Sequence, residues 1–123
     1  MQVRPMRDHR KLRAFELADS LALAIYKATT NYPKAEQYDL VKQMRRAAVS
    51  VPCNIVEGCA KPTEPDFLRY LDIAYGSCRE LEYQISLSHR LGFLPGPDYE
   101  PLTALSEETG RVLHGLIRSL RKG

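Results

Sequence analysis

Ser50, Asn54 and Glu57 have the residue types and the spacing for acid–base chemistry. They recur at steps of four and three residues, so a helix would place a hydroxyl, an amide and a carboxylate on one face. Glu80 and Glu82, further along the chain, would supply a second carboxylate. Carboxylates beside polar groups of this kind are what general acid–base catalysis uses.

No histidine or cysteine completes a nucleophilic set with these residues. A polar residue in a mostly apolar helix is usually satisfied by a neighbouring helix. We therefore interpret the set as a structural polar network between two helices, and we expect no enzymatic activity. A small bundle enzyme that uses Glu57 and Glu80 is the alternative. The expected network comprises Arg46, Ser50, Asn54, Glu57, Ser77 and Glu80.

The spacing of cysteine and histidine argues against a metal centre. Cys53 and Cys59 are six residues apart and would point to different sides of a helix. Helical di-iron sites place a glutamate three residues before each histidine, but these positions hold Met6, Ser86 and Arg111. We expect neither a metal nor a cofactor, and we interpret the three cysteines as small buried hydrophobic residues.

Basic residues gather near both ends of the chain. Residues 1–13 contain five Arg or Lys and one Asp, a net charge of +4, whereas the whole chain carries +3. Basic ends on a near-neutral body are typical of nucleic-acid binding, but they also solubilise termini and complement helix C-termini. No aromatic residue is interleaved with them to stack on bases. The candidate nucleic-acid-binding residues are Arg4, Arg7, Arg10, Lys11, Arg13, Arg118, Arg121 and Lys122.

The apolar residues that must position these groups recur at helical spacing. Such stripes run through residues 14–32, 44–59, 67–88 and 102–120, and Pro33 and the loop 94–98 interrupt the pattern. Thr63 or Asp66 would cap the third helix, and Gly92 would end it. The pattern predicts an all-α protein, with a basic N-terminal arm at 1–12 and an antiparallel up-down-up-down four-helix bundle at 13–122.

Length and composition fit one globular domain. The chain has 123 residues, of which 44% are hydrophobic and 27% are charged. No apolar run approaches the roughly 18 to 20 residues that a membrane span needs, and the basic N-terminus lacks the apolar stretch of a signal peptide. We expect a soluble cytoplasmic protein that does not enter a membrane.

The second predicted helix has two apolar stripes. A helix that is apolar on two sides is either central in its domain or faces a second subunit, and a four-helix bundle has no central position. We infer a homo-oligomer; the alternative is that small residues are tolerated at the boundary of the core. Pro52 must either kink this helix or split it in two. The first stripe is Met44, Ala48, Val51, Ile55 and Cys59, and the second is Val49, Cys53, Val56 and Ala60.

Two sequence blocks resemble a known bacterial family. The run QMRRAAVSVPCNIVEG at 43–58 resembles the pattern Q-x-R-R-A-A-x-S-[IV]-P-x-N-I-x-E-G of the four-helix-bundle proteins encoded in 23S rRNA intervening sequences. The run FLRYLDIAYGSCRELE at 67–82 resembles the second block of that family, with its G-S-x-x-E-L-E core. The resemblance covers residues 12–121, and Val56 and Cys59 depart from the usual residues.

The resemblance implies a bundle that assembles into a ring, most often a homopentamer, with no known enzymatic activity. More distant relatives include the accessory protein of diversity-generating retroelements, a basic pentameric barrel that binds a reverse transcriptase and its RNA. It therefore implies a scaffold that binds RNA or DNA, with a reverse transcriptase as a partner. A module that assembles and binds only protein is the alternative, and an exposed apolar groove would favour it.

Overall fold

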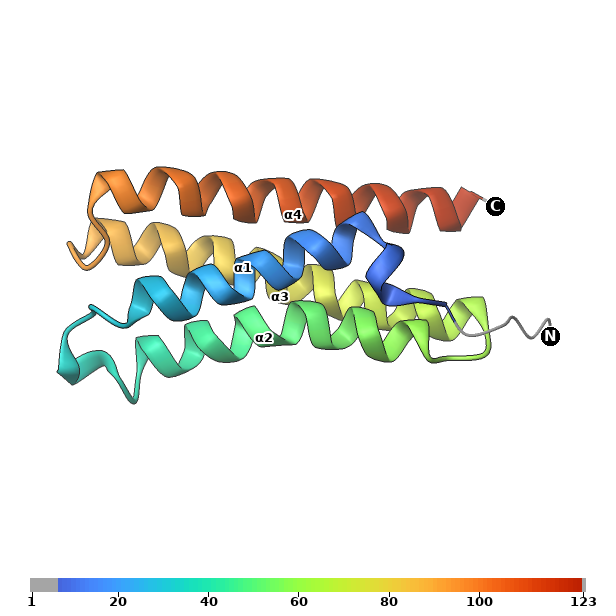
Figure 1. The fold of residues 1–123 in the computed structure, drawn as a ribbon, viewed down its shortest axis with the longest axis horizontal. Coiled ribbons are helices and arrows are strands. Elements are labelled where there is room, and N and C mark those ends of the chain that lie inside the picture. Colours follow the sequence, from blue (N-terminus) through green and yellow to red (C-terminus); the bar gives the residue numbers. More distant parts are fainter. Residues whose placement is uncertain (1–6, 123) are drawn as a thin grey trace.

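Four α-helices make up the part of the chain that the structure describes, residues 7–122 of a computed structural model. The helices are α1 (Arg13–Thr29), α2 (Leu40–Cys59), α3 (Glu64–Arg90) and α4 (Gly96–Lys122), and no strand occurs among the described residues. Two short 3₁₀ turns, η1 (His9–Lys11) and η2 (Lys34–Glu36), precede α1 and α2. The prediction of an all-α protein with four helices is confirmed (Figure 1).

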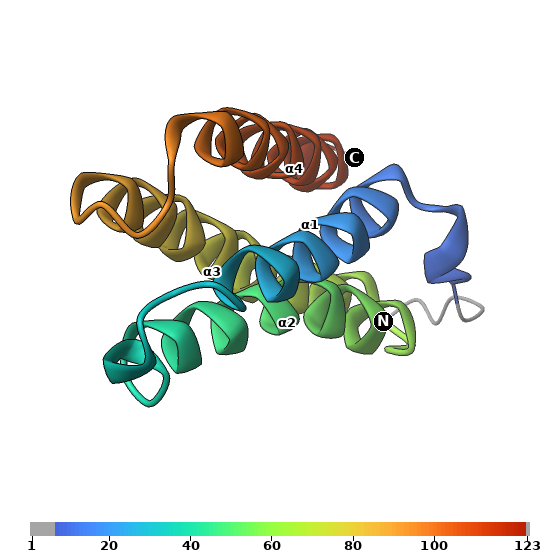
Figure 2. The same cartoon turned by 60° about the vertical axis from the view of Figure 1, so that its left-hand side comes forward.

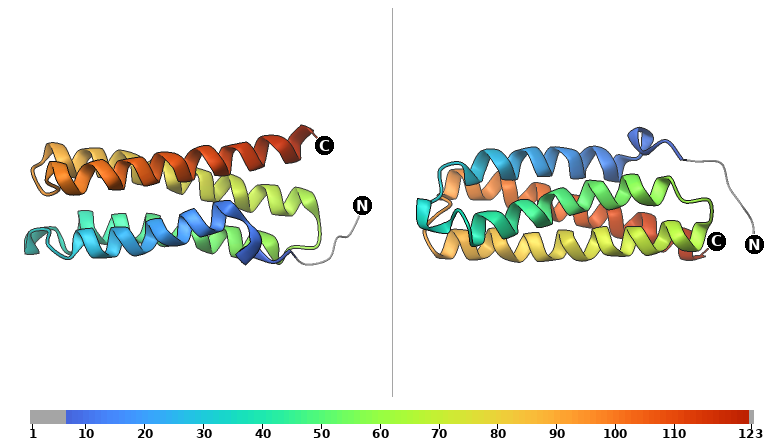
Figure 3. Two further views of the ribbon diagram at one scale, coloured as in Figure 1. Left: turned by 45° about the horizontal axis from the view of Figure 1, so that its top comes forward. Right: turned by 90° about the horizontal axis from the view of Figure 1, so that it is seen from below.

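Each helix packs on two neighbours around a common core. Contacts join α1 to α2, α2 to α3, α3 to α4 and α4 to α1, whereas the Cα atoms of diagonal helices stay more than 8 Å apart within the described range. Successive helices run in opposite directions along the long axis (Figure 1). The α1–α2 and α3–α4 connections lie at one end of the bundle (Figure 2), and the start of α1, the α2–α3 connection and the end of α4 lie at the other (Figure 3).

The apolar stripes form the core as expected. Met44, Val51 and Ile55 on α2 are fully buried, as are Leu71 and Leu81 on α3. The second stripe of α2 lies outside this core: Val49 and Val56 remain 37% and 38% exposed, and Cys53 is exposed as well. The prediction that all three cysteines are buried is therefore wrong for Cys53, because it belongs to the outer stripe.

Local signals at the ends of α3 explain where that helix starts and stops. The Thr63 hydroxyl accepts a hydrogen bond from the Asp66 backbone N–H at 3.4 Å, so Thr63 is the N-cap. Gly92 has φ of +84°, and the Phe93 N–H donates to the Ser88 carbonyl at 2.9 Å. This pairing is a Schellman motif, which needs a left-handed residue that glycine supplies without steric cost.

Pro52 lies inside a single helix. The α2 helix runs from Leu40 to Cys59 without a break, so the alternative that it splits in two is wrong. The ring of Pro52 is buried. Burial of this apolar residue offsets part of the free energy lost with the hydrogen bond that proline removes from the helix.

Gly58 allows α2 and α3 to approach closely near the α2–α3 connection. A Cβ atom on Gly58 would lie 3.0 Å from the Tyr70 Cβ, 3.1 Å from the Phe67 Cδ1 and 3.3 Å from the Phe67 carbonyl oxygen. These atoms belong to packed side chains and to backbone, so they have little room to move. The absent side chain therefore fixes the separation of the two helices.

Gly58→Ala should lower the free energy of unfolding by about 1–2 kcal/mol, measured by urea denaturation. The conflict of the new Cβ with Phe67 and Tyr70 should cost more stability than the gain of about 1 kcal/mol that alanine brings over glycine in a helix interior. Gly76→Ala is the control, since a Cβ on Gly76 would meet no atom within 4 Å. Gly76→Ala should stabilise the protein, and equal stability of the two variants would contradict the close-approach argument.

Candidate nucleic-acid interface

Three polar residues form a hydrogen-bonded cluster between α2 and α3. The hydroxyls of Ser50 and Ser77 lie 2.8 Å apart. The Asn54 side-chain amide donates to the Ser50 carbonyl at 2.8 Å and to the Ser50 hydroxyl at 3.0 Å. All three side chains are half-buried, so each bond is partly shielded from water. The cluster joins the two family blocks through one contact.

The remaining members of the predicted network lie outside this cluster. Glu80 is exposed and accepts a hydrogen bond from the Gln84 side-chain amide at 3.2 Å. Arg46 and Glu57 are exposed, and neither bonds to the cluster within the described residues. The predicted Arg46–Glu57–Glu80 link is therefore not formed. No hydrogen bond joins Glu57 to Glu80 among the described residues.

A different carboxylate, that of Glu82 on α3, has a raised pKa. Burial raises the pKa of Glu82, the nearby Arg79 guanidinium lowers it, and Glu107 raises it further. Glu82 lines a small pocket of about 230 Å³ between α3 and α4. Burial likewise raises the pKa of the neighbouring Cys78 thiol to about 12, so this thiol is protonated at neutral pH. A protonated thiol is a poor nucleophile and a poor metal ligand.

Neither a metal centre nor a membrane span is found in the described part of the chain. No group of three His, Cys, Asp or Glu side chains between residues 7 and 122 could hold a metal ion. None of the helices described there combines the length and the apolar character needed to cross a bilayer.

Most of the basic residues near the N-terminus are engaged with the protein itself. The Arg7 guanidinium lies 4.0 Å from the centroid of the Phe67 ring, and the Arg7 backbone N–H donates to the Cys59 carbonyl at 3.1 Å. Arg10 forms an ion pair with Asp8 at 2.9 Å, and Arg13 approaches Glu108 at 3.4 Å. The Arg10 guanidinium lowers the pKa of the Asp8 carboxyl.

The C-terminal cations are only partly engaged. Arg121 forms an ion pair with Asp72 on α3. Arg118, Lys122 and the N-terminal Lys11 are exposed and form no ion pair within the described residues. Arg4 lies outside the described residues. The described cations of this set belong to η1, the start of α1 and the end of α4, at one end of the bundle (Figure 1).

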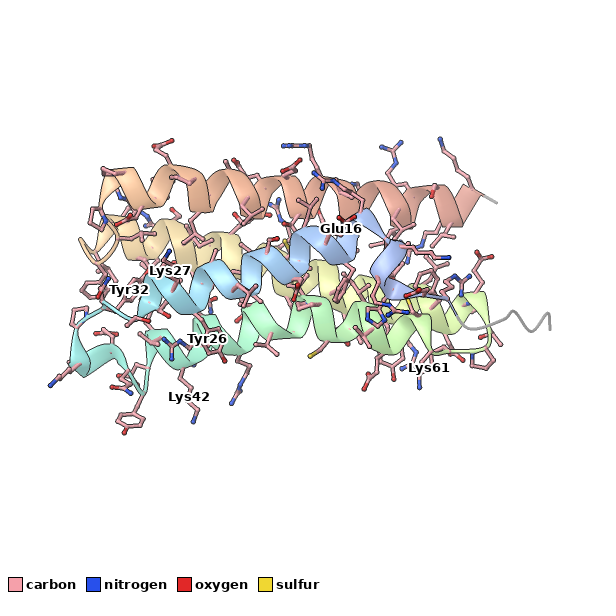
Figure 4. The ribbon with its side chains drawn as sticks, in the orientation of Figure 1. Glu16, Tyr26, Lys27, Tyr32, Lys42 and Lys61 are labelled. Atoms are coloured by element: carbon pink, nitrogen blue, oxygen red, sulfur yellow. The ribbon has the colours of Figure 1, made fainter. Side chains whose placement is uncertain are left out.

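A second basic surface, which the sequence analysis missed, lies at the opposite end of the bundle. A groove of about 640 Å³ runs between α1 and α2 beside their connection. Figure 4 shows Tyr26 on α1 and Lys42 on α2 close together there, with the Lys42 side chain pointing away from the bundle. We call it the α1–α2 groove; its lining residues are Tyr26, Gln37, Tyr38, Val41, Lys42, Arg45, Arg46, Val49 and Ser50.

Arg45 holds the two walls of the α1–α2 groove together. Its guanidinium donates from Nε to the Thr29 hydroxyl at 2.9 Å and from Nη2 to the Tyr26 carbonyl at 3.2 Å. It also stacks on the Tyr26 ring, 4.5 Å from the ring centroid. These contacts place a cation at the C-terminus of α1, where the helix dipole favours positive charge. The partners are all uncharged, so the charge of Arg45 is not neutralised.

A spacing signal for this surface was present in the sequence. Lys42 and Arg46 are four residues apart, so α2 places them on one side, and Tyr38 in the turn before α2 lines the same groove. Tyr26, however, belongs to α1, and only the packing of α1 on α2 brings it to them. Two aromatic rings, Tyr26 and Tyr38, therefore accompany the cations of this groove.

Ser50→Ala and Ser77→Ala should each lower the free energy of unfolding by about 0.5–1.5 kcal/mol, measured by urea denaturation. The double variant should lose less than the sum of the two losses, because either single variant already removes the contact between the Ser50 and Ser77 hydroxyls. Ser119→Ala is the control, since the exposed Ser119 hydroxyl bonds only within its own helix, to the Leu116 carbonyl at 2.8 Å. Additive effects of the Ser50 and Ser77 variants would show that the contact does not contribute.

Comparison with known proteins supports the family that the two sequence blocks indicate. A crystal structure of a protein of unknown function from the S23 ribosomal protein family of Bacteroides thetaiotaomicron is similar in fold, with a TM-score of 0.78 and 24% identity. The match covers 85% of this chain and 95% of that chain. No curated protein matches the chain. The family model described as 23S rRNA-intervening sequence protein matches residues 10–115, and the chain therefore belongs to that family.

Proposed function

We propose that this protein is a non-enzymatic scaffold that assembles with copies of itself and binds nucleic acid through its exposed basic surface. The observation that carries this proposal is the two-sided character of α2. One apolar stripe of α2 is fully buried, and a second one, which contains Val49 and Val56, stays exposed on the outside of the bundle. A single chain leaves this stripe in water, whereas a second copy would cover it.

The proposed assembly is a ring, and a pentamer is the form that the family resemblance implies. Five copies would multiply the net charge of +3 of one chain and bring five sets of basic residues together. Weak contacts to phosphates from each copy would then combine into avidity. As an accessory to a retroelement reverse transcriptase, such a ring would hold RNA near that enzyme.

The purely protein-binding alternative has one supporting observation. A groove of about 540 Å³ between α1 and α4 is lined mainly by apolar residues, among them Phe93, Leu102 and Leu105. Its two charged lining residues, Lys27 and Asp98, have opposite signs, so the groove has no excess of positive charge. It suits an apolar segment of a partner better than a nucleic acid.

The double variant Val49→Glu/Val56→Glu should shift the protein from an oligomer to a monomer in size-exclusion chromatography with light scattering. Both side chains are already partly exposed, so the folded monomer should tolerate the change, whereas an interface would bury the new charges at high cost. Native mass spectrometry of the wild type should give the subunit number, and five is expected.

Leu23→Glu is the matched control, because Leu23 is an exposed apolar residue on α1, at 68% exposure. This variant should keep the mass of the wild-type assembly. A monomeric wild type, or an unchanged assembly of the Val49→Glu/Val56→Glu variant, would overturn the proposed interface.

Titration of the protein with a structured RNA and with a DNA duplex, at several salt concentrations, should show binding that weakens steeply with salt. The double variant Arg118→Gln/Lys122→Gln should reduce the slope of log K against log salt by about 0.9 for each duplex phosphate contact it removes. Deletion of residues 1–13 is a poorer test, because it also removes Arg7 from the Phe67 ring. No binding at low salt would remove the nucleic-acid function and leave the protein-binding scaffold.

A further inference from the structure

We propose that the α1–α2 groove is a binding site for single-stranded nucleic acid, with unpaired bases stacked on Tyr38 and phosphates held by Lys42 and Arg46. This inference rests on the proposed nucleic-acid function, and it assigns that function a site and a class of ligand. It concerns the end of the bundle opposite to the start of α1 and the end of α4 (Figure 1).

The first argument is the state of the cations. Three positive charges line the α1–α2 groove, and none of its lining residues is acidic. Lys42 and Arg46 are exposed and form no ion pair with another described residue. By contrast, Arg10, Arg13 and Arg121 at the other end are each paired with a carboxylate. A phosphate therefore meets fewer competing anions in the groove.

The second argument is the placement of the aromatic rings. Tyr38 is 83% exposed and Tyr26 is 44% exposed, so neither ring is used mainly for the core. An exposed ring beside unpaired cations is the combination by which proteins hold single strands: the ring stacks on a base and the cations follow the phosphates. The Arg45 guanidinium on the Tyr26 ring adds a second planar surface for stacking.

The shape of the site favours a single strand over a duplex. The bases of a duplex are stacked on each other and paired, so their faces are not available to Tyr38, whereas unpaired bases can be splayed onto an aromatic ring. The groove, of about 640 Å³, falls within the usual size of ligand sites. A surface that recognised only duplex phosphates would need the cations but not the two exposed rings.

The test is a fluorescence anisotropy titration with a labelled oligouridylate, an unstructured strand, and with a labelled duplex. Tyr38→Ala should weaken oligouridylate binding about 5- to 150-fold, which is the loss of one stacked base. Tyr38→Phe should bind like the wild type, since the ring face is kept. Lys42→Gln/Arg46→Gln should reduce the salt slope for the oligouridylate by about 1.4, or 0.7 for each phosphate of a single strand.

The matched control is Arg118→Gln/Lys122→Gln, which removes the same two charges from the other end of the bundle. It should weaken duplex binding, and it should reduce oligouridylate binding less than Lys42→Gln/Arg46→Gln does. An oligothymidylate of equal length shows whether RNA or DNA is the preferred strand. All substituted side chains are exposed, and thermal unfolding should confirm that each variant is folded.

The outcomes separate this inference from the proposed function. If the wild type binds neither strand nor duplex at low salt, both fail. If the wild type binds the oligouridylate but Tyr38→Ala and Lys42→Gln/Arg46→Gln bind it equally well, the groove is not the site and only this inference fails. If the groove variants lose the oligouridylate while the terminal variant binds every probe like the wild type, the groove is the site and the terminal cations are not.

Discussion

The close packing of α2 on α3 is the contact on which the other features of this bundle depend. Gly58 meets Phe67 and Tyr70 at one end, the Ser50 hydroxyl meets that of Ser77 in the middle, and the Ser88 hydroxyl lies 3.3 Å from the Met44 sulfur further on. Residue numbers fall along α2 as they rise along α3, which is the register of antiparallel neighbours. These three contacts together fix the distance between α2 and α3, their register, and the rotation of α2 about its own axis.

This fixed rotation of α2 decides which of its residues remain available. Because one stripe faces the core, the opposite stripe, from Val49 to Ala60, must face outward. The same rotation turns Lys42 and Arg46 outward and leaves Arg45 to cap the end of α1. One side of α2 therefore faces the core, a second side carries the outer apolar stripe, and a third side lines the basic groove. Any slip in the register of α2 with α3 would disturb all three.

Sequence periodicity predicted the parts of this structure that depend on a single helix. The buried stripes, the Thr63 cap and the turn at Gly92 each arise from local spacing and backbone preference. Spacing along the sequence could indicate only the α2 part of the basic groove, because Tyr26 and Tyr38 belong to different elements and line one groove only after α1 packs on α2. The ion pair between Asp72 and Arg121 is another case: it joins residues 49 positions apart, and it partly neutralises a basic end that the sequence presents as free.

Ion pairing of this kind changes how charge should be used to locate a binding surface. Counting basic residues favours the termini, where residues 1–13 carry a net charge of +4. The availability of a cation to a phosphate depends instead on whether a carboxylate already satisfies it, since the phosphate must displace that partner. On this criterion Lys42 and Arg46 rank above the paired Arg10, Arg13 and Arg121, and level with the unpaired Lys11, Arg118 and Lys122. In the proposed ring each copy would contribute one such groove beside the outer stripe, because Val49 belongs to both. A strand long enough to reach two grooves would bind the second at a high effective concentration, so assembly itself would favour long single strands over short ones.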